Sequence, residues 1–352
     1  MNIRIIAFTA RGCELASRLR DGLSSQGDEC EAFAKTSSRG CGLVPVEASV
    51  KDWTTNAFAE CDALVFVGAT GIAVRSVAPF LRSKTVDPAV VVIDERGRHA
   101  ISLLSGHIGR GNELTLRASK IVGAEPVITT ATDINGLFSA DAFASRQGMA
   151  IDDISLVKDV SSALLEGERV GLSSDYPVVG QVPEELTVGE EGDLGIHITS
   201  METGSPFART LRLIPRNIII GIGCRRGTSG ARIAEKVFEA FRTHGLSLKG
   251  ARMVASIDLK ADEPGLLEFS QRYGLVARFF TAEELASVPD AGFSSSEFVA
   301  SVAGVGNVCE RAAMAASVHG RLIQGKMASD GVTVALAMDE FAVTFEEDAE
   351  ND

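Results

Sequence analysis

The strongest constraint on the fold is a junction that occurs three times in the chain, in which a short apolar run enters a glycine-containing loop and a helical pattern follows. The apolar runs are Ala63–Val67, His99–Leu104 and 218–222. Short apolar runs bounded by turn residues indicate buried strands, and strands that alternate with helices are typical of α/β sheets. We therefore expect an α/β fold. In open sheets of this class, ligands bind in the loops beyond the carboxyl ends of the strands.

The loop after the second run, residues 105–111, has the features of an anion-binding site. It contains three glycines, which allow the backbone to come close to a ligand, and the side chains of His107 and Arg110. We expect Asn112 to cap the next helix and Gly123 to end it. A helix start presents unpaired N–H groups and a partial positive charge, both of which attract anions.

A structural alternative stays open for this loop. Any α/β protein connects a strand to a helix in a similar way, and a loop histidine is often only a hydrogen-bonded polar side chain. Ser105 and His107 resemble a nucleophile and its base, but residues two apart in a loop need not face each other. We expect Ser105 to be a hydrogen-bonding loop residue. Spacing alone does not decide whether His107 has a functional role.

Length and charge limit the classes of protein to which the chain can belong. Its 352 residues suffice for two or three domains, and its hydrophobic content of 45% is that of a globular protein. The net charge of −13 argues against non-specific binding to nucleic acid or to an anionic membrane, so an anionic ligand needs local cations. The sequence has no stretch of about 18 apolar residues that could span a membrane.

The cysteine pattern bears on the compartment and on metal binding. Six cysteines are scattered without C-x-x-C spacing: Cys13, Cys30, Cys41, Cys61, Cys224 and Cys309. This pattern fits reduced thiols in the cytoplasm better than a disulfide framework or a zinc site. We therefore expect a cytoplasmic protein whose own side chains bind no metal.

Changes of pattern along the chain predict two α/β sheet domains that face each other across a cleft, joined by a smaller α+β middle region. The predicted parts are an amino-terminal domain (1–137), the middle region (138–215), a carboxyl-terminal domain (216–338) and an acidic tail (339–352). We assign the apolar runs as follows: 3–8, 63–67 and 90–93 to the first sheet and 218–222 to the second.

The third junction, residues 221–229, predicts an anion clamp and not a nucleotide site. Its glycines follow G-x-G-x-x-x-G and not the dinucleotide fingerprint G-x-G-x-x-G, and the chain has neither a P-loop nor a G-x-S-x-G elbow. Arg225 and Arg226 at the helix entrance can hold an anion, or they can pair with surface carboxylates. A nucleotide-binding α/β protein stays an alternative that equilibrium binding of NAD, FAD or ATP would test.

Eight segments spread over nearly the whole chain closely resemble the cobalt-precorrin-5A hydrolases, the CbiG proteins of anaerobic cobalamin (vitamin B12) synthesis. They are 66–75 (FVGATGIAVR), 87–94 (DPAVVVID), 102–109 (SLLSGHIG), 128–133 (ITTATD), 221–229 (GIGCRRGTS), 255–260 (ASIDLK), 305–310 (VGNVCE) and 331–337 (GVTVALA). The middle region carries the loosest resemblance. Arg110 and Gly111 depart from the family pattern without removing a group that we assign to chemistry.

The resemblance implies an enzyme that opens the ring-A δ-lactone of cobalt-precorrin-5A and releases acetaldehyde, giving cobalt-precorrin-5B. The substrate is a cobalt tetrapyrrole with many carboxylates, and it carries the cobalt, so no protein cofactor is expected. Neighbouring pathway methyltransferases are candidate partners. The alternative from another class is a non-catalytic protein that binds or carries a corrinoid intermediate, which would release no acetaldehyde.

Given this reaction, the chemistry needs a base to activate water and donors to hold an oxyanion. His107 is the first candidate base, with Asp133 and Glu310 as further candidate catalytic residues and the amides of 106–111 as donors. Each carboxylate has a structural alternative as a turn or helix cap. The candidate substrate-binding residues are Gly68, Thr70, Gly71, Arg75, Ser105, Gly106, Arg110, Arg225, Arg226 and Lys260.

Overall fold

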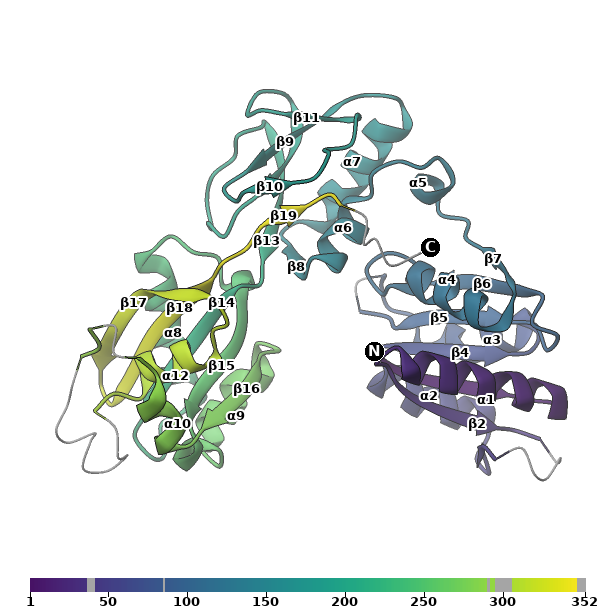
Figure 1. Ribbon diagram of the computed structural model, residues 1–352, viewed down its shortest axis with the longest axis horizontal. Coiled ribbons are helices and arrows are strands. Elements are labelled where there is room, and N and C mark those ends of the chain that lie inside the picture. The colour runs from purple at the N-terminus through teal and green to yellow at the C-terminus, as the bar shows by residue number, and fades with distance from the viewer. Residues whose placement is uncertain (37–41, 85, 290–291, 295–305, 347–352) are drawn as a thin grey trace. The chain divides into compact units, whose positions relative to one another are not determined.

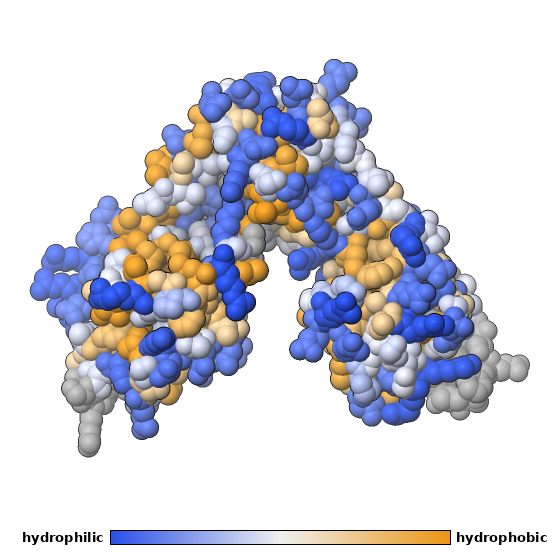
Figure 2. All heavy atoms as spheres, turned by 180° about the vertical axis from the view of Figure 1, so that it is seen from behind, coloured by the Kyte–Doolittle hydropathy of each residue, from blue (hydrophilic) through white to orange (hydrophobic). Residues whose placement is uncertain are grey.

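The computed structural model describes residues 1–36, 42–84, 86–289, 292–294 and 306–346. The chain forms two compact units, Met1–Ser145 and Arg146–Asp352 (Figure 1). Both units combine sheets with helices, which confirms the α/β class. No helix among the described residues is long and apolar enough to cross a bilayer. On the face shown in Figure 2, hydrophilic and hydrophobic residues are intermixed over the surface.

A seven-stranded sheet with the order β3-β2-β1-β4-β5-β6-β7 organises the first unit. Its strands are β1 (Asn2–Ala7), β2 (Glu29–Ala34), β3 (Val44–Pro45), β4 (Ala63–Val67), β5 (Ala89–Ile93), β6 (His99–Leu104) and β7 (Glu125–Val127). All neighbouring pairs are parallel except β5 and β6, which are antiparallel. The last two strands therefore run against the other five.

The reversal follows from the short turn between β5 and β6. The carboxylate of Asp94 accepts hydrogen bonds from the amides of Arg96, Arg98 and His99, and Gly97 takes the left-handed conformation with φ of 66°. A connection this short joins antiparallel strands only, because a parallel crossover needs about a dozen residues or more. We call the end of the sheet where β1, β4 and β5 finish the β4 end. The opposite end, where β6 and β7 finish, is the β6 end.

Helices cover both faces of this sheet (Figure 1). They are α1 (Ala10–Ser25), α2 (Val50–Glu60), α3 (Thr70–Val77), the 3-10 turn η1 (Ala78–Phe80) and α4 (Gly111–Val122). Two short helices, α5 (Ala131–Ile134) and α6 (Ala140–Arg146), follow β7 along the chain. Side chains alternate along each strand, so Ile5 packs with α1 and α4 while Ile6 packs with α2 and α3. Burial of both faces explains why β4 and β5 are apolar throughout.

The second unit begins with a five-stranded sheet of order β11-β9-β12-β13-β8. Its elements are β8 (Met149–Ile151), α7 (Ile154–Leu165), β9 (Val170–Ser174), β11 (Leu186–Val188), β12 (Leu194–Ile198) and β13 (Arg209–Pro215). The ring of Phe207 packs so closely on Gly171 and Gly195 that a Cβ at either glycine would lie 2.3 Å from a ring atom. Both glycines are therefore required by close packing.

Part of the predicted acidic tail belongs to the fold. Val343–Thr344 forms a strand, β19, that pairs with β10 (Val178–Val179), and the side chain of Val343 is fully buried. Asp339 ends β18 and lies 2.8 Å from Arg252. Apolar side chains within the acidic sequence explain why these residues pack. Residues 347–352 lie outside the described residues.

A second five-stranded sheet, of order β16-β15-β14-β18-β17, completes this unit. Its strands are β14 (Ile218–Cys224), β15 (Ala251–Ile257), β16 (Val276–Phe280), β17 (Gly320–Ser329) and β18 (Val332–Asp339). The accompanying helices are α8 (Gly230–Thr243), α9 (Pro264–Arg272), α10 (Ala282–Ser287) and α12 (Cys309–Ala316), with 3-10 turns η2 (Leu248–Gly250) and η3 (Asp258–Lys260). The four apolar runs thus lie in two different sheets, as predicted.

Candidate functional site

The parallel pairing of β6 with β7 brings His107 and Asp133 together. His99 of β6 is in register with Glu125 of β7, so the loops that follow the two strands both lie at the β6 end. The Nε2 atom of His107 is 2.7 Å from Oδ2 of Asp133. Two of the three predicted catalytic residues therefore form a direct hydrogen bond.

A second carboxylate, which the sequence analysis missed, contacts the other nitrogen of the same ring. Oδ1 of Asp141, in the first turn of α6, is 3.0 Å from Nδ1 of His107. The hydroxyl of Ser139 is 3.2 Å from Nδ1 and donates to Asp141 Oδ1 at 2.8 Å. The imidazole thus lies between two carboxylates. An acidic residue in a first helical turn is common, so the sequence held no signal that marks Asp141.

The exposure of the side chains increases along this row. The exposed fraction is 5% for Asp141, 12% for His107 and 36% for Asp133. Burial by itself lowers the pKa of His107, but the hydrogen bonds and charges of Asp141 and Asp133 outweigh it and raise that pKa above the ordinary 6.5. Burial likewise raises the pKa of Asp141, yet its hydrogen bond to His107 and the charge of that ring lower it to about 2.

The raised pKa changes the role that His107 can have. A protonated ring donates from both nitrogens, one to each carboxylate, and it cannot take a proton from water. His107 remains in this form to a higher pH than a free histidine does. Asp133 is then the member of the row that faces solvent. Its Oδ1 accepts no hydrogen bond within the described part of the chain, whereas its Oδ2 accepts from His107 and from Asn112.

Asn112 does not cap the helix as predicted. The helix α4 begins at Gly111, and the cap position belongs to Arg110, whose backbone is left-handed with φ of 60°. The Asn112 amide group faces the interior, where it accepts from Ser102 Oγ at 2.6 Å and donates to Asp133 Oδ2 at 3.0 Å. The reason is the tight bend at Arg110, which starts the helix earlier. The predicted helix end at Gly123 is confirmed.

The expectation of free amides is wrong for three residues at this helix start. The amides of Arg110, Gly111 and Asn112 donate to the carbonyls of His107, Ser105 and Gly106 at 2.9–3.0 Å. The loop therefore satisfies these donors itself. Its glycines serve close packing, since a Cβ at Gly106 would lie 2.6 Å from Asn112 Oδ1. As expected, Ser105 is a hydrogen-bonding loop residue, whose hydroxyl donates to Asp87 O at 2.9 Å.

Four predicted substrate-binding residues lie at the β4 end, away from the β6 end of the same sheet. Gly68 follows β4, and Thr70, Gly71 and Arg75 belong to α3. The side chain of Arg75 folds back over the first turn, where a Cβ on Gly71 would be 3.3 Å from its Nη1 atom. The loops after β4 and β6 lie apart because β6 runs antiparallel to β5. These residues cannot share a compact site with His107.

Three of the five predicted cations have carboxylate partners. Arg110 forms a two-pronged pair with Glu113 (2.7 and 2.5 Å), Arg226 is 3.4 Å from Asp262, and Lys260 is 3.2 Å from Glu263. The alternative of surface ion pairs therefore holds for Arg226, which is 70% exposed.

The remaining two predicted cations differ from these, and one further lysine lies near His107 and Asp141. Among the residues that the structure describes, no carboxylate oxygen lies within 4.0 Å of Arg75 or Arg225. At the β6 end, Nζ of Lys84 is 3.6 Å from Oδ2 of Asp141, and its side chain is 47% exposed. Lys84 stands in a segment without a motif, so its position at this site could not be predicted from the sequence.

Glu310, the third predicted catalytic residue, belongs to the second unit and is 4% exposed. One oxygen accepts from the amide of Lys326 at 2.7 Å. The other accepts from the amide and hydroxyl of Ser294 at 3.0 and 2.9 Å and from the side chain of Asn307. This carboxylate therefore ties together a loop, the start of α12 and β17. A purely structural role for Glu310, the alternative given above, explains all of these contacts.

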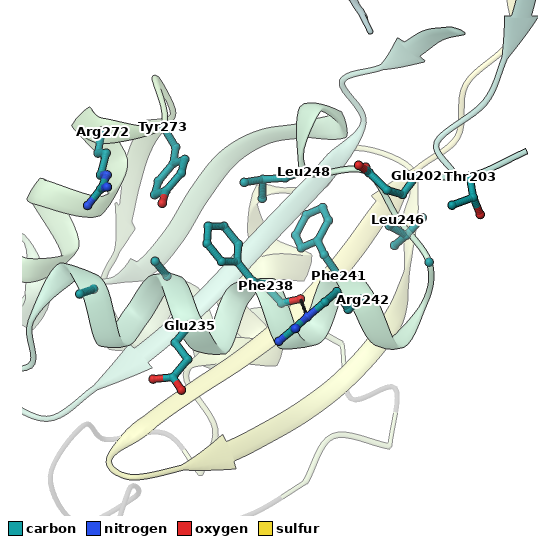
Figure 3. Close-up of a pocket in the computed structure, with 13 residues that line it drawn as sticks. Glu202, Thr203, Glu235, Phe238, Phe241, Arg242, Leu246, Leu248, Arg272 and Tyr273 are labelled. Atoms are coloured by element: carbon teal, nitrogen blue, oxygen red, sulfur yellow. Dashed lines mark hydrogen bonds between the residues drawn. The ribbon is translucent and has the colours of Figure 1, made fainter. Parts of the chain in front are cut away.

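The second unit also contains an apolar groove of about 820 Å³ along α8 (Figure 3). Phe238 and Phe241 rise from α8 toward Leu248, and Tyr273 closes one side, with Arg272 beside it. None of the residues predicted for the site lines this groove. Within the described residues, no group of three or more His, Cys, Asp or Glu side chains could hold a metal ion.

Comparison with known proteins gives matches along nearly the whole chain. Residues 52–133 match the family "Cobalamin synthesis G N-terminal", 138–215 match "Cobalamin biosynthesis central region" and 218–337 match "Cobalamin synthesis G C-terminus". The cobalt-precorrin-5A hydrolase of Salmonella typhimurium is 35% identical over 350 residues, covering 96% of this chain and 97% of that protein.

Two further matches also extend over nearly the whole chain. The cobalt-precorrin-5A hydrolase of Priestia megaterium is 30% identical over 354 residues, covering 95% of this chain and 94% of that protein. The crystal structure of a cobalamin biosynthesis protein G homolog from Sulfolobus solfataricus aligns with a TM-score of 0.41 at 23% identity, over 96% of this chain and 97% of the other.

Proposed function

The chain belongs to the cobalamin synthesis G family, and from this premise we infer that it is a cobalt-precorrin-5A hydrolase. The observation that carries the inference is the 35% identity to a hydrolase of that name over 96% of this chain. The reaction opens the ring-A δ-lactone of cobalt-precorrin-5A and releases acetaldehyde, giving cobalt-precorrin-5B. Cobalt belongs to the substrate.

We assign the proton transfers of this reaction to Asp133, with His107 as its charged partner. Three observations support the assignment. Asp133 is the most exposed of the three groups at the β6 end, its Oδ1 is unoccupied among described residues, and its Oδ2 is held by two donors. A base must reach water while its orientation is fixed by its neighbours, and Asp133 meets both conditions.

The assignment gives a balanced sequence of proton transfers. Asp133 takes a proton from the water that attacks the lactone carbonyl, and the ring oxygen leaves as an alkoxide that receives this proton. Asp133 then removes the proton from the new hydroxyl group as the carbon–carbon bond breaks. The broken bond leaves its electron pair on the conjugated macrocycle, and the departing two-carbon unit becomes acetaldehyde. Asp133 then releases its proton to solvent, which regenerates the base. The hydrogen bond from His107 Nε2 holds Oδ2 of Asp133 in place during these steps.

The substrate is a polyanion, and we propose that Lys84, in the first unit, contacts its carboxylates; we propose Arg225, in the second unit, as a separate anion-binding residue. Lys84 stands at the β6 end, and Arg225 has no carboxylate partner among described residues. Arg110, Arg226 and Lys260 are weaker candidates because Glu113, Asp262 and Glu263 already neutralise them, whereas Asp141, the carboxylate near Lys84, also contacts the ring of His107. We further propose a cytoplasmic location, which suits the free thiols of the five described cysteines, and neighbouring pathway methyltransferases as partners.

The decisive experiment incubates the protein with cobalt-precorrin-5A and measures acetaldehyde. The wild type should release acetaldehyde in proportion to the substrate consumed. Asp133→Asn should bind the substrate, as followed by its absorbance spectrum, but lose about 10²–10⁴-fold in rate. His99→Ala, at the β4 end, is the matched control and should retain full activity. Binding by the wild type without acetaldehyde release would identify a corrinoid-binding protein instead.

A further inference from the structure

We propose that Asp141 is a positioning residue for this reaction: its buried carboxylate holds the ring of His107 so that Nε2–H is directed at Asp133. The proposal rests on the proposed function, because it names a residue that acts through the catalytic pair. Asp141 lies in the first turn of α6, 34 residues after His107 and eight after Asp133. Like Ser139 and Lys84 at this site, it stands outside the sequence motifs.

The burial of Asp141 is the first observation. Its carboxylate is 5% exposed, and a buried charge is costly unless it is paired and hydrogen-bonded. Oδ1 is 3.0 Å from Nδ1 of His107 and accepts from Ser139 Oγ at 2.8 Å and from the amide of Ala142 at 3.2 Å. Oδ2 is 3.6 Å from Nζ of Lys84. Two cations thus face one buried anion.

The order of the groups is the second observation. Asp141, His107 and Asp133 form a row in which each contacts the next through the ring, and exposure rises from the first to the last. A buried carboxylate behind an imidazole fixes both the orientation of the ring and the nitrogen that carries the proton. Without Asp141, Ser139 is the one remaining partner that the structure shows for Nδ1. A neutral hydroxyl accepts less strongly than a carboxylate and would leave the ring less constrained.

The charges around the ring give a prediction of pH dependence. The titratable groups that face His107 are Asp133 on α5 and Asp141 on α6, and Lys84 faces Asp141 from the segment before β5. Replacement of Asp141 by Asn removes one of the two negative charges that raise the pKa of His107. The pKa of the ring should therefore fall. Activity that depends on the protonated ring should then be lost at a lower pH than in the wild type.

The contrasting explanation is that Asp141 only caps the start of α6. A cap would affect thermal stability but not the titration of His107, and its loss would lower the amount of folded enzyme without changing the pH profile. The matched control is Glu125→Gln, because Oε2 of Glu125 lies 3.8 Å from Nε2 of His99 and is exposed at the β4 end. This substitution also removes a carboxylate beside a histidine of the same sheet.

The test combines kinetics with NMR on the full-length protein. For Asp141→Asn we expect kcat to fall about 10-fold to 100-fold with KM nearly unchanged, the alkaline limb of the rate profile to move to lower pH, and Asp141→Glu to restore part of the rate. Glu125→Gln should match the wild type. An Asp141→Asn enzyme with wild-type kcat and an unmoved alkaline limb would overturn the proposal.

The NMR measurement is made on the wild-type protein without substrate. It therefore does not depend on whether the Asp141→Asn variant folds. The ¹⁵N resonances of the His107 ring in the wild type should show a protonated imidazole to a pH above 6.5, the ordinary pKa of histidine. A ring that titrates at or below this value would also overturn the proposal. Failure of the proposed function looks different, since the wild type itself would then release no acetaldehyde while the titration of His107 stayed as expected.

Discussion

Replacement of His107 by alanine should destabilise the protein as well as inactivate it. From sequence alone, a loop histidine near a cleft would contribute little to folding. The structure contradicts that expectation, because the ring is 12% exposed and lies between two carboxylates. The substitution leaves Asp141, which is 5% exposed, without its nearest cation. Activity and stability are therefore coupled at this position.

The magnitude follows from the two contacts. A hydrogen bond to a buried charged group contributes about 1.5–3 kcal/mol, which applies to Asp141. The contact with Asp133, a carboxylate that is 36% exposed, contributes about 0–1 kcal/mol after screening by solvent. The free energy of unfolding should fall by about 2–4 kcal/mol in total. For a unit of the size of Met1–Ser145, which contains His107, 1 kcal/mol corresponds to about 2–4 °C, so the Tm of this unit should fall by roughly 5–15 °C.

The difference in Tm between the wild type and His107→Ala depends on pH, and the shifted pKa values set the direction of this dependence. The pKa of His107 is raised in the folded state, so its contribution is complete below 6.5 and is lost as pH rises through the folded value. The pKa of Asp141 is lowered, so its contribution is complete above 3.8 and is lost as pH falls toward about 2. The Tm difference should be largest between these two ordinary values and shrink at alkaline pH.

Calorimetry of wild type and His107→Ala from pH 5 to pH 9 measures this effect, and acetaldehyde release on the same preparations measures activity. His99→Ala is again the control, since His99 is 52% exposed and its nearest carboxylate oxygen is 3.5 Å away. A Tm difference that stays constant over the pH range would refute the electrostatic explanation. A His107→Ala protein that is destabilised but fully active would remove the ring from the catalytic assignment.

Two further substitutions test the loop and the cationic residues. Gly106→Ala should lower kcat about 10-fold or more, because its Cβ would lie 2.6 Å from Oδ1 of Asn112 and displace the amide that holds Asp133; unchanged kcat would show that this contact has no role. Arg225→Ala should raise KM several-fold, whereas Arg226→Ala should not, because Asp262 already pairs with Arg226; equal effects on KM would contradict the distinction.

Much of the fold follows from the sequence, and the direction of β6 could have been predicted too. The residues between 93 and 99 form a recognisable turn, and a turn of that length joins antiparallel strands. The expectation that ligands bind beyond the carboxyl ends of the strands did not take into account that these ends lie at opposite sides of the sheet for β4 and β6. If β6 had been predicted to run antiparallel to β5, Arg75 would have been assigned to the β4 end and Asp133 to the end where His107 lies. The turn can be recognised from a few neighbouring residues, whereas its effect on the site concerns residues far apart in the sequence.

The contact of Asp141 with His107 could not have been predicted in the same way. No period or spacing relates this residue to His107, because their contact depends on the path of the chain through α4, β7 and α5. Helix ends were easier: Ser229 caps α8 and Thr281 starts a capping box, as the local sequence indicates. Contacts that depend on tertiary path carry no such signal.

Glu310 and Asp133 show why residue type alone does not identify the base. Each is an acidic residue in the first turn of a helix, in a segment that resembles the same family. In the structure, both oxygens of Glu310 accept hydrogen bonds, including two from backbone amides, and the side chain is nearly inaccessible. Asp133 instead uses one oxygen for its neighbours and keeps the other toward solvent. A proton acceptor must reach water, so the base is better assigned to Asp133, whereas Glu310 maintains the structure around α12.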